Sequence, residues 1–398
     1  MRILCAFSKY NYGDVSLGLG IEYVAFLGAL KRMGHRVLHL DTGDKYAYPT
    51  PAPLNQALLN AVLEEKPDVL LTVQKDCEIW IETLCAIRAW SPTKTITWAT
   101  DDSFKFRKVS QFIARHYDLI TTTYDYCVEA YHGKGIYNVA LTQWAANSQW
   151  LQPPLPASAC EYDVTFVGIN YGTRGELIER LRAEGIAVEC FGRGWPNGTI
   201  ATEELPLIFR NSRISLNFSE ASQGRGAHPT QLKARTFEVP GAGGFLLTQD
   251  TPGLANYYIA GKEIATFHTA AEMVAKVLHY QKNPGERDAI AGAGFLRTRN
   301  EHTYEQRFQL ILQMAEKLPD KPKSPNDAPR DLAEAERRFR AMSPVLRALR
   351  WCLVRTGTAI WGEDRGIKAA RRLTFEASWR LAGERTFTAA GLPGRLFP

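Results

Sequence analysis

The segment that most constrains the fold runs from Leu216 to Gln249 and reads LNFSEASQGRGAHPTQLKARTFEVPGAGGFLLTQ. It begins as an apolar strand and continues through a polar, glycine-bearing loop. It becomes helical at QLKARTFE, breaks at PGAGG and re-enters a strand at FLLT. A strand, a glycine loop, a helix and a second strand form a βαβ unit, which binds its ligand at the carboxyl ends of the strands. The segment therefore predicts an α/β sheet with a ligand-binding loop.

The expected helix carries two cations and a carboxylate at close spacing. Lys233 and Arg235 precede Glu238, which is three positions beyond Arg235 and therefore on a neighbouring turn of the same face. Cations near a helix start bind phosphate, and a carboxylate accepts hydrogen bonds from the two hydroxyls of a ribose. This spacing favours a nucleotide pocket, and a surface ion pair on an amphipathic helix is the alternative.

Composition narrows the class of protein. The 398 residues leave room for two domains and an extension, and 45% hydrophobic with 23% charged residues is typical of a globular protein. The sequence has no secretory signal pattern, because its first residues read as a strand, and no apolar run approaches the roughly 20 residues that cross a bilayer. Seven cysteines lie scattered without metal-ligand spacing. We expect a cytoplasmic protein with reduced thiols.

Strands alternate with helices through both halves of the chain, which predicts parallel, doubly wound sheets. Residues 1–150 form the first half, whose opening strand-loop-helix-strand pattern lacks the glycine spacing of dinucleotide-binding proteins. A proline-rich linker over 152–162 leads to the second half at 160–318. We expect an α/β protein with two Rossmann-like domains facing each other across a cleft, followed by a helical C-terminal extension.

Three loops of the second half should meet at the carboxyl ends of its strands. Gly172 leaves the backbone open to a phosphate, and Arg174 adds positive charge at the next helix start. Arg193 and Trp195 could face a nucleobase or sugar, and a packing role for Trp195 is the alternative. His228 in the glycine loop is a candidate for the donor phosphate or an incidental loop residue.

Three motifs of the second half, DVTFVGINYGTR, CFGRGW and LKARTFEVPGAGGFLLTQD, resemble the C-terminal half of CgeB-like spore-maturation glycosyltransferases. TWATDDS and YDLITTT resemble their N-terminal half, so that the resemblance spans about residues 1–318. It implies the two-domain GT-B class, with Glu238 on the donor ribose and with Lys233 or Arg235, together with Arg174, on the diphosphate. Retaining members have a second glutamate where this chain has Thr230, which leaves the stereochemistry open.

The implied reaction moves a sugar from a nucleoside diphosphate sugar to a hydroxyl of a glycan, glycolipid or protein. Cations and helix N-termini rather than a metal would stabilise the leaving diphosphate, and no cofactor is expected. An inverting reaction needs a base from the first domain, for which Asp14 is the first candidate and Asp101 the second. Asp101 and Asp102 should point to opposite faces, which argues against a shared metal. The alternatives are a non-catalytic nucleotide-sugar-binding module, or an epimerase or phosphorylase.

Positive charge concentrates after the linker at 319–329. Residues 330–398 hold 14 Lys+Arg and 7 Asp+Glu, whereas the preceding chain is close to neutral. Helices expected within this extension mix arginines with apolar and aromatic residues, a pattern typical of binding to an anionic membrane surface. Packing on the protein body or on a second subunit is the alternative. Nucleic acid is not expected as a partner, because no binding motif is present.

Overall fold

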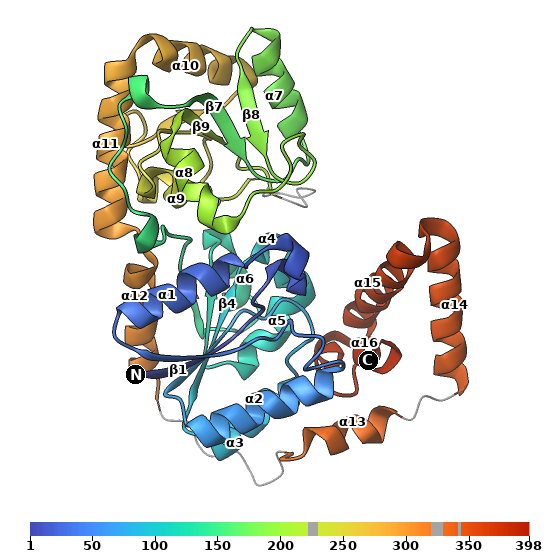
Figure 1. Ribbon diagram of the computed structural model, residues 1–398. Coiled ribbons are helices and arrows are strands. Elements are labelled where there is room, and N and C mark those ends of the chain that lie inside the picture. The colour runs from blue at the N-terminus through green and yellow to red at the C-terminus, as the bar shows by residue number, and fades with distance from the viewer. Residues whose placement is uncertain (222–229, 320–328, 341–343, 398) are drawn as a thin grey trace. The chain divides into compact units, whose positions relative to one another are not determined.

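The computed structural model describes residues 1–221, 230–319, 329–340 and 344–397. The chain forms two compact units (Figure 1). Unit 1 contains Met1–Asp14, Gly34–Leu141 and Gln313–Pro398, and unit 2 contains Val15–Met33 and Thr142–Leu312. Each unit has its own parallel sheet, which confirms the prediction of two α/β domains with C-terminal helices.

Unit 1 is built on a six-stranded parallel sheet in the order β2-β1-β3-β4-β5-β6. Every residue of β3 and β5 is buried, as expected for parallel strands that helices cover on both faces. Because β1 pairs with β2 on one side and β3 on the other, the topological switch point lies at β1. The strands are β1 (Arg2–Ala6), β2 (Arg36–Leu40), β3 (Val69–Thr72), β4 (Lys94–Ala99), β5 (Leu119–Thr122) and β6 (Val139–Leu141).

The helices of unit 1 form where apolar residues recur at helical spacing. In α2, Leu54, Leu58 and Val62 line one buried stripe, and a proline with its fixed φ starts the helix. The buried Asn55 ties α2 to α3, because its Oδ1 accepts from the Trp80 N–H at 2.8 Å. The helices within the body of this unit are α2 (Pro51–Glu65), α3 (Ile81–Trp90), α4 (Asp102–Lys105), α5 (Gln111–Ile113) and α6 (Asp125–His132).

Unit 2 is built on a five-stranded parallel sheet in the order β11-β10-β9-β7-β8. β7 pairs with β8 on one side and with β9 on the other, so its switch point lies between β7 and β9. The strands are β7 (Tyr162–Val167), β8 (Val188–Phe191), β9 (Ser212–Asn217), β10 (Leu246–Gln249) and β11 (Ala265–Phe267).

One long helix of unit 2, α11, is absent from the sequence-based expectation, although Asn283-Pro284 is a typical helix start. It carries Arg287, which is fully buried and donates hydrogen bonds to the carbonyls of Leu155, Ser212 and Arg213. The helices of unit 2 are α1 (Leu27–Arg32), α7 (Arg174–Ala183), α8 (Leu205–Arg210), α9 (Arg235–Gly241), α10 (Ala270–Lys282) and α11 (Pro284–Glu301), while α12 (Tyr304–Lys317) has residues in both units.

The C-terminal helices belong to unit 1. Leu332 and Phe387 are fully buried in the core that α2 and α3 share, and the Glu82 carboxylate accepts from the Ala389 N–H at 3.1 Å. Lys108 also pairs with Glu376. The alternative that this extension packs on the body is therefore confirmed for these segments, and α13 likewise contacts α2 (both labelled in Figure 1). The helices are α13 (Leu332–Arg340), α14 (Pro344–Trp361), α15 (Glu363–Ala382) and α16 (Leu392–Leu396).

Within the described ranges, no helix is long and apolar enough to cross a membrane. Residues 320–328 of the expected linker lie outside the described residues.

Candidate functional site

The candidate site of unit 2 lies at the carboxyl ends of β7 and β9, which is the switch point of this sheet. The loop after β7 contains Gly168, whose φ of 155° places its backbone directly under the Arg235 guanidinium. A Cβ at position 168 would lie 2.2 Å from Nη1 of Arg235. Glycine is therefore required here because of both the backbone conformation and the close approach of the arginine.

Arg174 holds the loop after β7 in place through hydrogen bonds. Its side chain is 2% exposed, and the guanidinium donates hydrogen bonds to the Ile169 carbonyl and the Tyr171 hydroxyl, both at 2.8 Å. The same group stacks on the Tyr171 ring at 3.8 Å from its centroid. Burial lowers the pKa of Arg174. The sequence pointed to Arg174 but not to Tyr171, although an aromatic residue three positions before a buried arginine is the available signal.

The helix expected at QLKARTFE begins later than predicted. α9 starts at Arg235, and before it the Gln231 N–H donates to the Ser219 carbonyl at 2.7 Å, which ties residue 231 to the end of β9. Lys233 therefore precedes the helix rather than lying on it, and its Nζ is 3.3 Å from the Tyr171 hydroxyl. The expected break at PGAGG is also wrong at its first two residues, since Pro240 in the last turn costs the helix only one hydrogen bond.

Arg235 faces the switch point. Its guanidinium donates to Asn217 Oδ1 at 3.0 Å and also to the Val167 carbonyl. Desolvation is the main cause that lowers the pKa of Arg235 to about 10, and the charge of Arg174 lowers it further. Arg174, Lys233 and Arg235 thus form a cationic cluster around Tyr171, where an anion would gain from several charges at once.

Glu238 is buried one turn into α9, with 6% of its surface exposed. Desolvation raises the pKa of Glu238 to about 7, and the nearby Arg235 charge offsets part of this increase. A buried carboxylate with a strongly perturbed pKa is typical of a functional site rather than of a solvated ion pair. The surface-pair alternative therefore does not describe Glu238.

The Glu220 side chain, which is not among the predicted site residues, occupies the space beside Gly172. The Glu220 carboxylate accepts from the Thr173 N–H at 2.9 Å and from the Thr173 hydroxyl at 3.1 Å. A Cβ at Gly172, where φ is 61°, would lie 2.2 Å from this carboxylate. Gly172 thus admits an anionic group at the start of α7. A charged residue three positions after the buried strand β9 was the signal for Glu220.

The other residues predicted for the donor site differ in burial and in their contacts. Arg193 is exposed and its carbonyl accepts from the Asn170 N–H at 2.9 Å. Trp195 is buried and donates from Nε1 to the Gly168 carbonyl at 2.8 Å, so that its alternative role in packing is confirmed. Thr230 accepts from the Thr251 hydroxyl at 2.9 Å. His228 lies outside the described residues.

The two candidate bases lie at the carboxyl ends of strands in unit 1. Asp14 is exposed in the loop after β1, beside Tyr12, which holds the left-handed φ of 55° that non-glycine residues rarely adopt. Asp101 follows β4 and is half-buried, and its carbonyl accepts from the first turn of α4. Their base roles stay predictions.

The second residue of the acidic pair after β4 has a structural role. Asp102 is 2% exposed and accepts from the Ser110 hydroxyl at 2.6 Å and the Tyr131 hydroxyl at 2.8 Å. Desolvation raises the pKa of Asp102, as expected for a buried carboxylate. Its two partners hold it inside unit 1. In the part of the chain that the structure describes, no group of three His, Cys, Asp or Glu side chains is placed to hold a metal ion.

Asp102→Ala should lower the free energy of unfolding by about 2–4 kcal/mol, because it leaves two buried hydroxyls without their acceptor. Asp101→Ala should leave the free energy of unfolding nearly unchanged, since its side chain is half-buried and does not cap α4. Urea unfolding of the two variants checks this difference. Equal losses of stability would contradict the structural assignment of Asp102.

Comparisons with known structures identify the class of fold. A glycosyltransferase from Rickettsia africae matches at a TM-score of 0.57 and 10% identity, covering 80% of this chain and 98% of that one. HepE from Anabaena, solved with UDP-glucose, matches at 0.56 and 12% identity, covering 79% and 100%. Sucrose-phosphate synthase from Thermosynechococcus elongatus matches at 0.55 and 12% identity, covering 80% and 99%. The protein has the GT-B fold of these enzymes.

The sequence of the second half supports the same class. Residues 174–313 match the family model described as Glycosyl transferase-like. This range contains α7, the β9 loop and α9, and hence Arg174, Glu220, Arg235 and Glu238. A comparison with curated proteins gives no match. The three cations and Glu238 thus lie in the part of the chain that matches the family model, while Gly168, Tyr171 and Gly172 directly precede it.

Proposed function

We propose that the protein is a CgeB-like glycosyltransferase that uses a nucleoside diphosphate sugar as its donor. The observation that carries this proposal is a buried carboxylate, Glu238, one turn from a cluster of three cations at the switch point of unit 2. In α/β sheets this edge binds nucleotides. Glu238 would accept hydrogen bonds from the ribose hydroxyls, while Lys233 would contact the diphosphate.

The two arginines of the cluster have different roles in this proposal. Arg235 keeps part of its surface exposed and adds positive charge beside the diphosphate. Arg174 is committed to Ile169 and Tyr171, so we assign it the positioning of the loop rather than a direct contact. Gly172 and the N-terminus of α7 would lie along the phosphates, where Glu220 now supplies the negative charge. Arg193 and His228 stay candidates for the sugar or the phosphate.

The proposed reaction forms a bond between an acceptor hydroxyl oxygen and the anomeric carbon of the donor sugar. The bond from that carbon to the diphosphate breaks, and the diphosphate leaves with the electron pair. Asp14 or Asp101 would take the hydroxyl proton if the configuration inverts. The cations stabilise the charge that develops on the leaving group, which is why we propose a metal-independent reaction.

We place the protein in the cytoplasm, with a hydroxyl of a glycan, a lipid-linked sugar or a protein as acceptor. A lipid-linked acceptor would require access to the inner face of a membrane, and the basic helices after residue 330 are the part of the chain suited to that contact.

A panel of nucleotide sugars tests the function, beginning with UDP-glucose because HepE was solved with it. The correct donor at about 100 times its dissociation constant should stabilise the protein by about 2.7 kcal/mol, visible as a rise in melting temperature of several degrees. Release of nucleoside diphosphate that depends on an acceptor identifies a transferase. Stabilisation without release identifies a binding module, and an altered sugar on an intact nucleotide identifies an epimerase.

A further inference from the structure

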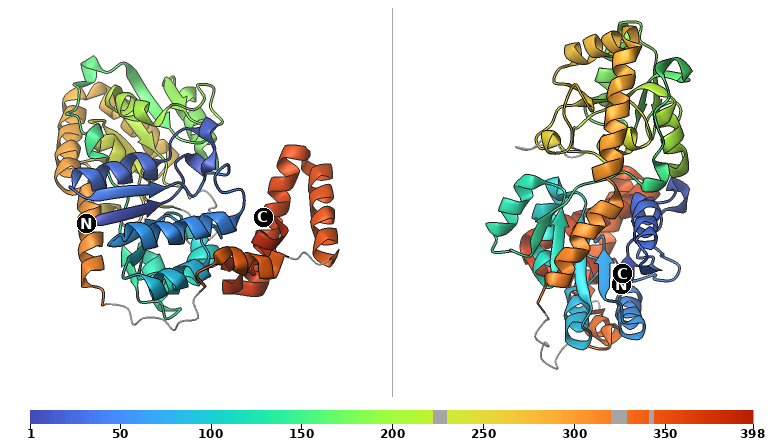
Figure 2. Two further views of the ribbon diagram at one scale, coloured as in Figure 1. Left: turned by 60° about the horizontal axis from the view of Figure 1, so that its bottom comes forward. Right: turned by 90° about the vertical axis from the view of Figure 1, so that its left-hand side faces the viewer.

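The last two long helices form a hairpin that projects its outer helix away from the sheet of unit 1. α14 packs mainly against α15 and makes a smaller contact with α16 (Figure 2). The two helices approach closely where Gly357 faces Gly366, since a Cβ at Gly357 would lie 2.6 Å from the Gly366 carbonyl oxygen. The end of α15 anchors the hairpin, because Glu376 pairs with Lys108. The hairpin is thus held at its base, while α14 leaves much of its surface uncovered.

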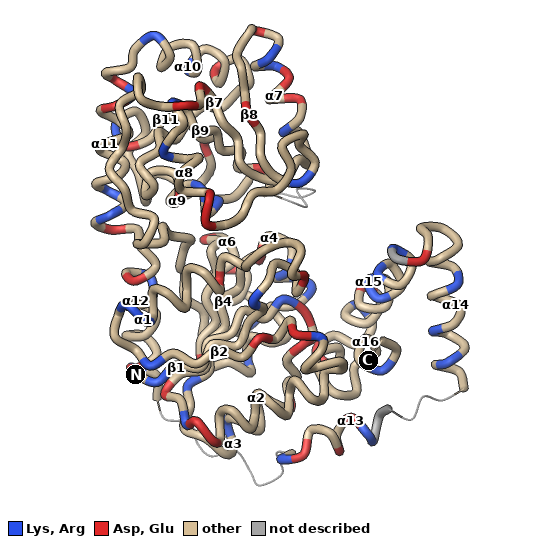
Figure 3. Tube along the Cα trace, viewed as in Figure 1, with Lys and Arg blue, Asp and Glu red and all other residues tan. Residues whose placement is uncertain are grey.

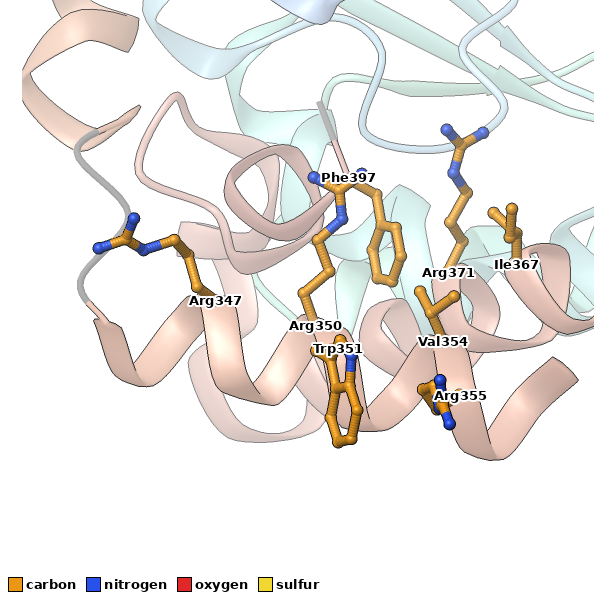
Figure 4. Close-up of a pocket in the computed structure, with 8 residues that line it drawn as sticks. All are labelled: Arg347, Arg350, Trp351, Val354, Arg355, Ile367, Arg371 and Phe397. Carbon is orange, nitrogen blue, oxygen red and sulfur yellow. The ribbon is translucent and has the colours of Figure 1, made fainter. Parts of the chain in front are cut away.

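A pocket of about 550 Å³ opens between these helices (Figure 4). Its charged lining consists of four exposed arginines, and its remaining walls are apolar or aromatic. Figure 4 shows the Phe397 ring between Arg350 and Arg371, whose guanidinium carbons lie 5.7 and 6.0 Å from the ring centroid. The lining residues are Arg347, Arg350, Trp351, Val354, Arg355, Ile367, Arg371 and Phe397.

The hairpin carries far more basic than acidic side chains. The segment 344–382 holds eight basic and three acidic residues, and Figure 3 shows the basic ones as blue stretches along α14 and α15. Glu376, one of the three acidic residues, is engaged by Lys108 and Arg380. Guanidinium groups that outnumber the nearby carboxylates attract anions, and they bind phosphate in a bidentate manner.

Apolar side chains lie exposed on the same hairpin. Trp351 is 61% exposed and Val345 is 75% exposed on α14, and Trp361 is 47% exposed at its end. Tryptophan next to arginine is the combination that sits at the boundary between lipid headgroups and acyl chains. A second copy of this chain would bring the same positive charge against itself, which disfavours self-association through this face.

We propose that the α14–α15 hairpin is a docking site for an anionic phospholipid bilayer, with a headgroup phosphate in the arginine pocket and Trp351 in the interface. The geometry commits to a lipid surface because the phosphate-binding groups and the exposed apolar groups share one hairpin. This inference does not depend on the proposed transferase activity. It would, however, hold unit 1 at the surface where a lipid-linked acceptor resides.

Cosedimentation of the whole 398-residue chain with vesicles tests the proposal. We expect binding to vesicles of phosphatidylcholine mixed with phosphatidylglycerol and little binding to phosphatidylcholine alone. A fourfold Arg→Gln variant of the pocket should weaken binding by at least about 100-fold, since each basic residue near an anionic surface contributes on the order of fivefold. Raising the salt from about 0.1 M to about 1 M should also weaken it, because the Debye length falls from about 10 Å to about 3 Å. The variant combines Arg347→Gln, Arg350→Gln, Arg355→Gln and Arg371→Gln.

The matched control removes the same number of exposed arginines elsewhere and should bind as the parent does. Both fourfold variants should stay folded with melting temperatures within a few degrees of the parent, because every altered side chain is exposed and exposed ion pairs contribute little to stability. Trp351→Ala tests the apolar part of the contact separately and should weaken vesicle binding several-fold. Equal binding by the pocket and control variants, equal binding to both lipid mixtures, or binding of glycerol phosphate without vesicle binding would each overturn the proposal. The control combines Arg36→Gln, Arg180→Gln, Arg182→Gln and Arg299→Gln.

Discussion

Glu238→Gln is expected to weaken donor binding and, at the same time, to stabilise the unliganded protein above pH 7. Burial raises the pKa of Glu238 from 4.5 in the unfolded chain to about 7 in the fold. The folded state therefore holds the proton more tightly, and the contribution of Glu238 to stability falls as the pH rises from about 4.5 through about 7. Above pH 7 the cost of the buried charge is complete, at about 3 kcal/mol.

The neutral amide of glutamine avoids that cost, but it is a weaker ligand for the donor. A carboxylate accepts two charge-assisted hydrogen bonds from a ribose, and each of them is stronger than a bond to a neutral amide. We therefore expect Glu238→Gln to lose donor affinity by roughly 10- to 100-fold. Thermal melts at pH 5 and pH 8, with and without the donor, check both effects.

Glu189→Gln serves as the control, because Glu189 is exposed on β8 in the same unit. It should change neither the pH dependence of the melting temperature nor the donor-induced shift. If Glu238→Gln binds the donor as tightly as the parent, the ribose assignment is wrong. If it gives no gain in stability at pH 8 relative to pH 5, Glu238 does not titrate as its burial implies.

Within the cationic cluster, we expect substitution of Arg174 to lower stability and substitution of Lys233 to lower donor affinity. Arg174→Ala should lower the free energy of unfolding by about 2–5 kcal/mol, because it removes two hydrogen bonds and a stacked ring from a side chain that is 2% exposed. Lys233→Ala should leave stability within about 1 kcal/mol, since its side chain is only partly buried. Lys233→Ala should instead weaken donor binding by about 10-fold or more, through the loss of a charge-assisted contact with phosphate.

Urea unfolding and donor titration of both variants check this separation. Arg174→Lys keeps the charge but not the fork of hydrogen-bond donors, and it should resemble Arg174→Ala in stability. Recovery of the parent stability in Arg174→Lys would show that charge rather than geometry sets the role of Arg174. Parent-like donor affinity in Lys233→Ala would remove Lys233 from the site.

The pattern of apolar strands was sufficient to predict both sheets. Segments such as VLLT at 69–72 are continuous apolar runs, and only burial on both faces explains such runs in a parallel strand. The position of Glu238 on the helix of a βαβ unit was also predictable, because an apolar strand precedes this segment and glycines and a second strand follow it.

Contacts between distant segments were not predictable from local patterns. Gln231, four residues before α9, pairs with Ser219, which no local pattern of the sequence connects to it. A local effect acts at residues 251–258, where Thr251-Pro252 is a typical helix start. Gly253 there adopts a left-handed φ of 82°, and only the 3-10 turn Leu254–Asn256 forms. The space over Gly172 is filled by Glu220 from another strand end, which no spacing rule connects to it.

The burial of Leu332, Phe387 and Ala389 determines how the chain can be shortened. These three side chains are part of the same apolar core as α2 and α3, although they lie far along the sequence in a segment of basic composition. A protein ending at residue 329 would leave the surface of α2 and α3 open to water and prone to aggregation. Engineering that aims to dispense with membrane contact should therefore alter the outer face of α14 and keep the C-terminal residues that complete unit 1.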